Sequence, residues 1–144
     1  MKHTRKKAKE YFAKYYIKKQ LKKLNGEEKG YIYIISSPTF KDWIKIGRTT
    51  NDPKIRVTSF NVATPFRDFV LDYMKEVENT QRAEYQLHEK VYNNKLTKER
   101  VGEWFKITNK NKVIQLMENY NNEKLSKADI VYRKEFYRGL YETH

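Results

Sequence analysis

Two short β-rich runs, separated by a segment that favours a turn, occupy residues 30–47 and constrain the fold more than any other feature. In the first run tyrosines alternate with isoleucines. In the second, WIKIG at residues 43–47, a tryptophan and a lysine alternate with two isoleucines. Successive side chains of a strand point to opposite faces of its sheet. If the strands pair with both isoleucine sets toward the core, Tyr31, Tyr33 and Lys45 share the other face. Such a face suits a functional site better than simple packing.

The net charge indicates a polyanionic partner. The 144-residue chain holds 31 Lys and Arg against 18 Asp and Glu, a net charge of +13, and such a field attracts polyanions before any specific contact forms. Its 12 Tyr and 7 Phe place aromatic rings among these cations, which suits contacts with phosphates and bases. We therefore expect nucleic acid as the partner. The alternative is a lysine-rich composition that only keeps the protein soluble.

The length of the chain predicts one compact domain with extensions at both ends. Cysteine is absent, which excludes disulfide bonds and thiolate zinc sites and fits an intracellular setting. The N-terminal segment is basic and has no continuous apolar stretch, so it resembles neither a secretory signal nor a membrane span. We expect a soluble, intracellular protein that does not span a membrane.

Residues 2–25 are predicted to form a basic helix, because they are rich in lysine, contain one acid and lack proline and glycine. Apolar residues at helical spacing leave one face free to dock. The helix can lie along nucleic-acid phosphates, cap the fold, or lie on a membrane surface. Its candidate nucleic-acid-binding residues are Arg5, Lys6, Lys7, Lys18 and Lys22. We place the segment boundaries at 1–29 for this arm, 30–122 for the domain, and 123–144 for a basic, aromatic C-terminal extension.

Further elements follow the predicted hairpin. Asp52-Pro53 begins a helix, since an N-cap acceptor is followed by proline at the first helical position. Residues 66–77 are predicted to form a third strand, with Leu71 and Tyr73 on one face.

A second core helix is predicted at about residues 80–93, with Thr80 as its cap. Glu84 and His88 lie four residues apart on it, so they are neighbours on one face and can act together. The alternative for His88, a lone histidine beside an apolar stripe, is a structural role. Residues 94–102 are predicted to be a polar loop, and Trp104 and Phe105 after it are predicted to pack beneath the site. A last helix begins at Thr108 or Asn109.

The order of five segments resembles a known family. GYIYI, then IKIGRT, then a helix that begins Asp-Pro and contains an arginine, then Glu-x-x-x-His on a helix, and then EWF are similar to the GIY-YIG nuclease superfamily. The similarity is closest to a branch from phages and large viruses that is described as a DNA-binding domain and named for an open reading frame of phage T-five. It covers about residues 30–120. It implies an α+β fold with a small antiparallel three-stranded sheet and flanking helices, to which this chain adds its basic N-terminal helix and basic C-terminal extension.

The resemblance also implies a catalytic site. Members of the superfamily are generally metal-dependent endonucleases that cut a phosphodiester with a tyrosine, an arginine and a glutamate around one divalent cation. The residues that match by position are Tyr33, with Tyr31 as its alternative, Arg56, Glu84 and His88. Lys45 stands where the second motif usually has tyrosine.

The side chains suit this chemistry. A lone glutamate suits Mg²⁺ or another divalent cation, so Glu84 is the predicted metal ligand. Tyrosine is a weak base unless a cation near its oxygen favours phenolate. We expect Lys45 to be that cation and Tyr33 to accept a proton from the attacking water. The planar guanidinium of Arg56 can clamp phosphate oxygens, with Arg48 as a second phosphate contact.

Two functions compete at this point. The first is an endonuclease that hydrolyses DNA, with the basic flanks supplying affinity, and the presence of Tyr33, Arg56 and Glu84 together favours it. The second is a non-catalytic DNA-binding module of the same fold, which Lys45 favours. A third option is a virion or assembly protein that holds nucleic acid. The setting is then a host cytoplasm or a virion, and RNA remains open as the partner.

Overall fold

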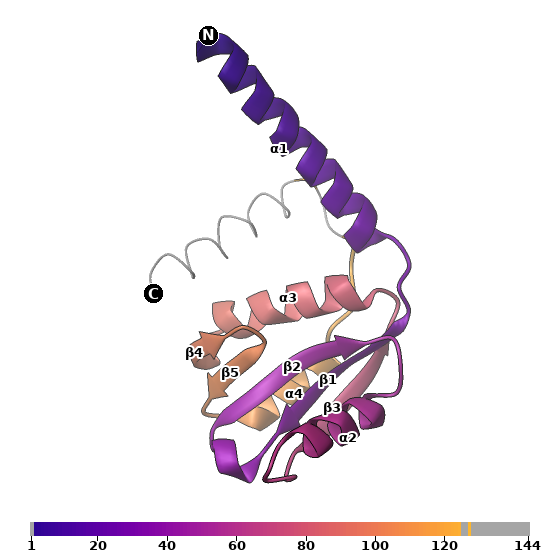
Figure 1. The fold of residues 1–144 in the computed structure, drawn as a ribbon, viewed down its shortest axis with the longest axis vertical. Coiled ribbons are helices and arrows are strands. Elements are labelled where there is room, and N and C mark those ends of the chain that lie inside the picture. The colour runs from indigo at the N-terminus through magenta and orange to yellow at the C-terminus, as the bar shows by residue number, and fades with distance from the viewer. Residues whose placement is uncertain (1, 125–126, 128–144) are drawn as a thin grey trace. The chain divides into compact units, whose positions relative to one another are not determined.

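The computed structural model describes residues 2–124 and residue 127, with side chains from residue 14 onward (Figure 1). These residues divide into two compact units. One contains residues 27–122 and holds the whole sheet, and the other contains helix α1 (Lys2–Asn25) with residues 123, 124 and 127. The predicted contacts of Arg5, Lys6 and Lys7 belong to side chains outside the described part. Most of the predicted extension at 123–144 also lies outside it.

Helix α1 confirms the helix predicted at residues 2–25, and Gly26 follows it directly. Its described lysines are all exposed, namely Lys14, Lys18, Lys19, Lys22 and Lys23. Among the described residues, no helix combines the length and the apolar character needed to cross a membrane.

The sheet contains five antiparallel strands in the order β3-β1-β2-β5-β4. The strands are β1 (Gly30–Ser36), β2 (Trp43–Thr49), β3 (Val70–Val77), β4 (Thr97–Val101) and β5 (Trp104–Ile107). The α+β class is confirmed, but the prediction of three strands is wrong. The stretch predicted as a polar loop is largely β4, an edge strand that pairs only with β5. Its sequence, TKERV, has no alternation of apolar residues. An edge strand packs little into the core, and its charged side chains deter pairing with other chains.

Opposite faces of the sheet carry separate layers of core, as the alternation in the hairpin predicts. Ile32, Ile34, Ile44 and Ile46 are all buried in one layer, against helices that follow in the sequence. Tyr33 and Ile35 belong to the other layer. The register Ile34↔Ile46 and Tyr33↔Gly47 fixes this division across β1 and β2.

Three helices cover the two faces (Figure 1). They are α2 (Pro53–Ala63), α3 (Thr80–Asn93) and α4 (Lys110–Glu118). Helices α3 and α4 supply Leu87 and Val113 to the layer that holds the isoleucines, whereas α2 packs on the layer that holds Tyr33. Asp52 caps α2 as predicted, through a hydrogen bond that its carboxylate accepts from the Lys54 amide (2.9 Å). Helix α3 is capped by Asn79 rather than by the predicted Thr80.

A β-bulge separates two residues that were predicted to share a face. The pairing of β1 with β3 shifts between Ile34 and Ile35, so Ile34 faces Tyr73 and Ile35 faces Leu71. Tyr73 consequently packs against the isoleucine layer and Leu71 against the Tyr33 layer. The prediction for β3 is therefore wrong at this point, because a bulge changes the side-chain alternation that a regular strand would keep.

The absence of a side chain at Gly47 leaves room for the phenol of Tyr33 on the opposite strand of the hairpin. A Cβ atom at position 47 would lie 2.5 Å from the Tyr33 hydroxyl oxygen and 2.6 Å from Cζ. Both distances are far inside van der Waals contact. The ring of Tyr33 therefore lies directly over the backbone of β2, in space that any other residue at position 47 would fill.

Gly47→Ala is expected to lower the free energy of unfolding by about 1–3 kcal/mol, because the added methyl group must push the buried phenol aside. Urea denaturation of both proteins measures this change. In a Tyr33→Ala background the same substitution should cost much less, so a double-mutant cycle should give a clear coupling energy between the two positions. Equal costs in both backgrounds would contradict this account of Gly47.

Candidate functional site

A cavity of about 480 Å³ opens where the hairpin, α2 and the turn between β4 and β5 meet, and we call it the polar cavity. Its lining includes Tyr33 of β1, Arg48 of β2, Arg56 and Ser59 of α2, and Glu103 of the turn. Three of these residues are sequence-predicted site residues that come from three different elements. The fold thus brings a phenol and two guanidinium groups to one concave surface.

Tyr33 is protonated in this environment at neutral pH. The residue is only 1% exposed, and burial raises the pKa of its phenol. Arg56 acts in the opposite direction through its charge and hydrogen bonding to the phenol, while the carboxylates of Glu103 and Glu84 raise the pKa further. The cation that acts on Tyr33 is therefore Arg56.

Lys45 has different partners from the one predicted for it. Its ammonium group lies 3.4 Å from a carboxylate oxygen of Glu103 and 4.3 Å from the centre of the Phe60 ring. It does share the sheet face of Tyr33, as expected. The ammonium group offsets the charge of Glu103 and lies over the face of the Phe60 ring. Both contacts stabilise an ammonium group of low exposure.

Glu84 is a carboxyl with too little positive charge around it. Burial is the main reason that its pKa is raised to about 7, and Glu103 adds to the rise, whereas Arg48, Lys45 and Arg100 lower it. The Arg48 Nε atom lies 4.0 Å from Glu84 Oε1. The other oxygen, Oε2, is buried and has no hydrogen-bond partner among the described residues.

These properties of Glu84 fit a metal ligand. A divalent cation would partner the buried oxygen and favour the ionised carboxylate. In the part of the chain that the structure describes, no three His, Asp or Glu side chains form a group that could hold a metal ion. Mg²⁺ needs no such group, because it takes one or two carboxylates and completes its shell with water and phosphate. Glu84 can supply one such carboxylate, although it is not among the residues that line the polar cavity.

Arg48 is held by an acidic residue that the sequence analysis missed. Its guanidinium donates a hydrogen bond to Glu28 Oε1 (3.0 Å), and Glu28 also accepts hydrogen bonds from Thr80 and from Gln81 Nε2 (2.7 Å). Glu28 precedes β1 and carries no pattern that could have identified it. Glu103, also missed, falls in the EWF segment of the resemblance, so position alone could have suggested it.

His88 is a buried structural residue. Its Nδ1 accepts a hydrogen bond from Arg100 (3.1 Å), since a guanidinium can only donate, and its Nε2 then donates to the Ile46 carbonyl (2.9 Å). Burial and Arg100 lower the pKa of the imidazole to about 3. Both nitrogens are therefore engaged away from the polar cavity, and the predicted joint action with Glu84 has no geometric support.

The remaining predicted residues have simpler positions. Tyr31 is half-buried and faces Thr49 and Glu76 across the neighbouring strands, outside the lining of the polar cavity. Phe105 is fully buried in the isoleucine layer as core, whereas Trp104 packs on the opposite layer. The prediction that both rings pack beneath the site therefore applies to Trp104 alone.

The raised pKa of Glu84 predicts a specific pH dependence for metal-free protein. Because the folded state binds this proton more tightly than the unfolded chain, the contribution of Glu84 to stability should fall as pH rises from about 4.5 to about 7. At pH 8 Glu84→Gln should be more stable than wild type by up to about 3 kcal/mol, and at pH 4 the two should be similar. Denaturant melts in chelator across this range measure the difference, with the exposed Glu76→Gln as control. A difference that does not vary with pH would contradict the assigned environment.

Comparisons with known proteins agree with the branch that the sequence resembles. The family model described as the T5orf172 domain matches residues 30–121, which include the whole sheet and every residue that lines the polar cavity. No curated protein and no solved structure matches the chain. Since the family model spans well over half of the sequence, the chain belongs to the T5orf172 domain family.

Proposed function

We propose that this protein is a metal-dependent endonuclease that hydrolyses DNA phosphodiesters in the polar cavity, as its resemblance to the GIY-YIG superfamily implies. One observation carries the proposal. The phenol of Tyr33 and the guanidinium of Arg56 interact within one cavity, and the carboxyl of Glu84 is near enough to raise the pKa of that phenol. These are the three side-chain types that the resemblance implies around one cation, and together they can orient water, bind phosphate and hold a metal ion.

Phosphate binding is the role of the two arginines. Arg56 is exposed on α2 and lines the cavity, so its planar fork can take two phosphate oxygens. Arg48 is held in place by Glu28, which supports a fixed rather than a flexible contact. Bound phosphate would also add negative charge beside Tyr33, which keeps the phenol protonated until further positive charge arrives.

The protonation state of the Tyr33 phenol decides whether it can accept a proton from the attacking water. As a neutral phenol it can orient the attacking water through a hydrogen bond, and it becomes a base only when nearby positive charge lowers its pKa. Arg56 already supplies part of that charge. A divalent cation such as Mg²⁺, held by Glu84 with help from Glu103, would activate water and offset charge on the phosphate when bound.

The alternative function is a DNA-binding module that does not cleave. The low exposure of Tyr33 and its raised pKa favour it, because a protonated, enclosed phenol can support the fold without taking a proton. Arg48 and Arg56 would then bind phosphate only.

Purified protein with Mg²⁺ should nick supercoiled plasmid DNA, and Glu84→Gln should lower the nicking rate by at least about 100-fold, because it removes the carboxylate charge proposed to hold the cation. Gel assays of nicking and equilibrium binding measure the two effects separately. DNA affinity in chelator should change little.

Glu76→Gln serves as the matched control and should cleave like wild type, since Glu76 is exposed on β3. Nicking that survives in Glu84→Gln would remove Glu84 from the reaction. Tight DNA binding without cleavage, under Mg²⁺, Mn²⁺ and other divalent ions, would favour the binding module.

The basic helix α1 is expected to contribute phosphate contacts. Replacing Lys18 and Lys22 together by glutamine should reduce the slope of log affinity against log salt by up to about two for duplex DNA, because fewer counterions are released. The control replaces Lys90 and Lys112, exposed lysines of α3 and α4, and so makes the same change in net charge. Equal slopes for the two double variants would show that α1 makes no specific contribution.

A further inference from the structure

A second cavity, of about 430 Å³, is formed almost entirely by aromatic rings, and we call it the aromatic cavity. Its lining includes Phe40, Trp43, Phe60, Phe69, Trp104 and Val101. Phe69 is 6% exposed, and the rings of Phe40, Phe60 and Trp104 have centroids 5.8–6.1 Å from its own. Asn61 fixes the Phe69 backbone by accepting a hydrogen bond from its amide (2.9 Å) and donating one to its carbonyl (3.1 Å).

The aromatic cavity adjoins the polar cavity. Ser59 and Phe60 are consecutive in α2, and Glu103 and Trp104 are consecutive at the start of β5, with one member of each pair in each cavity. Lys45 links the two, since its ammonium group contacts both Glu103 and the Phe60 ring. A strand with a phosphate in the polar cavity would therefore carry its neighbouring base toward the aromatic rings.

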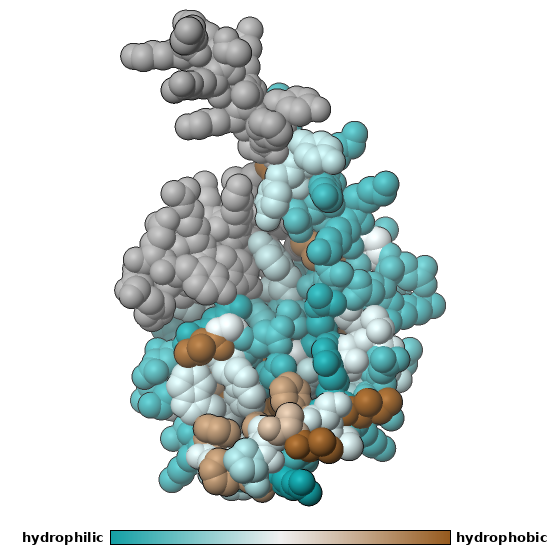
Figure 2. Space-filling view, viewed as in Figure 1, coloured by the Kyte–Doolittle hydropathy of each residue, from teal (hydrophilic) through white to brown (hydrophobic). Residues whose placement is uncertain are grey.

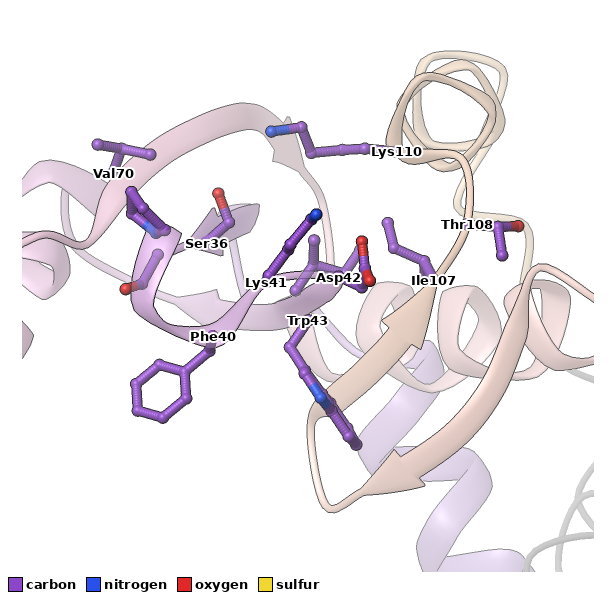
Figure 3. A pocket seen from close by; sticks show the side chains of 12 residues that line it. Ser36, Phe40, Lys41, Asp42, Trp43, Val70, Ile107, Thr108 and Lys110 are labelled. Atoms are coloured by element: carbon purple, nitrogen blue, oxygen red, sulfur yellow. The ribbon is translucent and has the colours of Figure 1, made fainter.

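The rings are accessible from solvent. Phe40 is 46% exposed, Val101 is 67% exposed, and Trp43 and Trp104 are half-buried. A neighbouring cavity of about 390 Å³ lies at the turn between β1 and β2. In Figure 3 Phe40 and Trp43 point away from Lys41, and Lys110 lies on the same side as Lys41 but comes from α4. In Figure 2 brown side chains gather over α2 and the adjacent end of the sheet, whereas most of the other described surface in view is teal.

We propose that the aromatic cavity holds an unpaired nucleobase of the DNA strand whose phosphate lies in the polar cavity. The proposal rests on the proposed function and specifies its substrate as DNA with a base out of the helix stack. Aromatic rings with a cation beside them suit the flat π-face and the adjoining phosphate of a nucleotide. The net charge of +13 and the continuity with the polar cavity favour nucleic acid over an apolar peptide.

Tryptophan fluorescence can detect binding in the aromatic cavity. It contains two tryptophans, Trp43 and Trp104, and both line the aromatic cavity. Stacking of a base on either indole should quench its fluorescence. The titration uses intact protein in chelator, so that no cleavage occurs, with a single-stranded oligonucleotide about ten nucleotides long. The comparison strand is abasic at every position and carries the same phosphates.

The base-containing strand should quench tryptophan emission and bind about tenfold more tightly than the abasic strand. Phe40→Ala should remove most of this difference and keep both tryptophans. Phe66→Ala is the matched control, because Phe66 is 61% exposed and does not line the cavity, and it should behave like wild type.

Equal affinity and equal emission with both strands would overturn the proposal, as would equal effects of the two phenylalanine substitutions. Quenching of the same size by a fully paired duplex with closed ends would overturn the claim that the base is unpaired. A change of oligomeric state in Phe40→Ala, without a change in DNA affinity, would show that a second copy of the chain covers the cavity. If the protein cleaves DNA but shows no base stacking, only the inference about the aromatic cavity is overturned. If it shows base stacking but does not cleave DNA, only the proposed nuclease activity is overturned.

Discussion

The contact between the Tyr33 ring and the backbone of Gly47 is the constraint on which the rest of the site depends. It holds a large polar side chain in the middle of a sheet, at a position that lines the polar cavity. Because the two residues face each other in the hairpin register, the same pairing that separates the core layers also aims the phenol. Arg56 can reach it because α2 packs on this face of the sheet.

Charge in the site is distributed so that the buried carboxyl of Glu84 is only partly compensated. Burial and the nearby Glu103 carboxylate raise the pKa of Glu84, and the nearby cations have other partners as well. Arg48 is bound to Glu28, and Lys45 is divided between Glu103 and an aromatic ring. An arrangement of this kind is typical of a functional site, since a protein optimised only for stability would neutralise a buried carboxyl.

The sequence predicted what depends on local pattern and on order along the chain. Strand alternation gave the two faces of the hairpin, and the order of motifs indicated Tyr33 and Glu84. Contacts between distant segments were not predictable from either source. Glu28, which precedes β1, accepts a hydrogen bond from Arg48 of β2. Strand β4 lacks an apolar pattern because it lies at the edge of the sheet. The cation beside Tyr33 was predicted to be Lys45 and is Arg56. Strand alternation gives the face on which Lys45 lies but not the direction in which its ammonium group points.

Burial of a neutral His88 gives the protein a second proton linkage, opposite in sign to that of Glu84. An unfolded chain binds a proton on this imidazole below about pH 6.5, whereas the folded protein does so only near pH 3, so the histidine makes stability fall as the solution becomes more acidic. Between about pH 4.5 and 6.5 the two slopes cancel. In mildly acidic solution the combined contribution of these two side chains to the folding equilibrium is therefore nearly independent of pH.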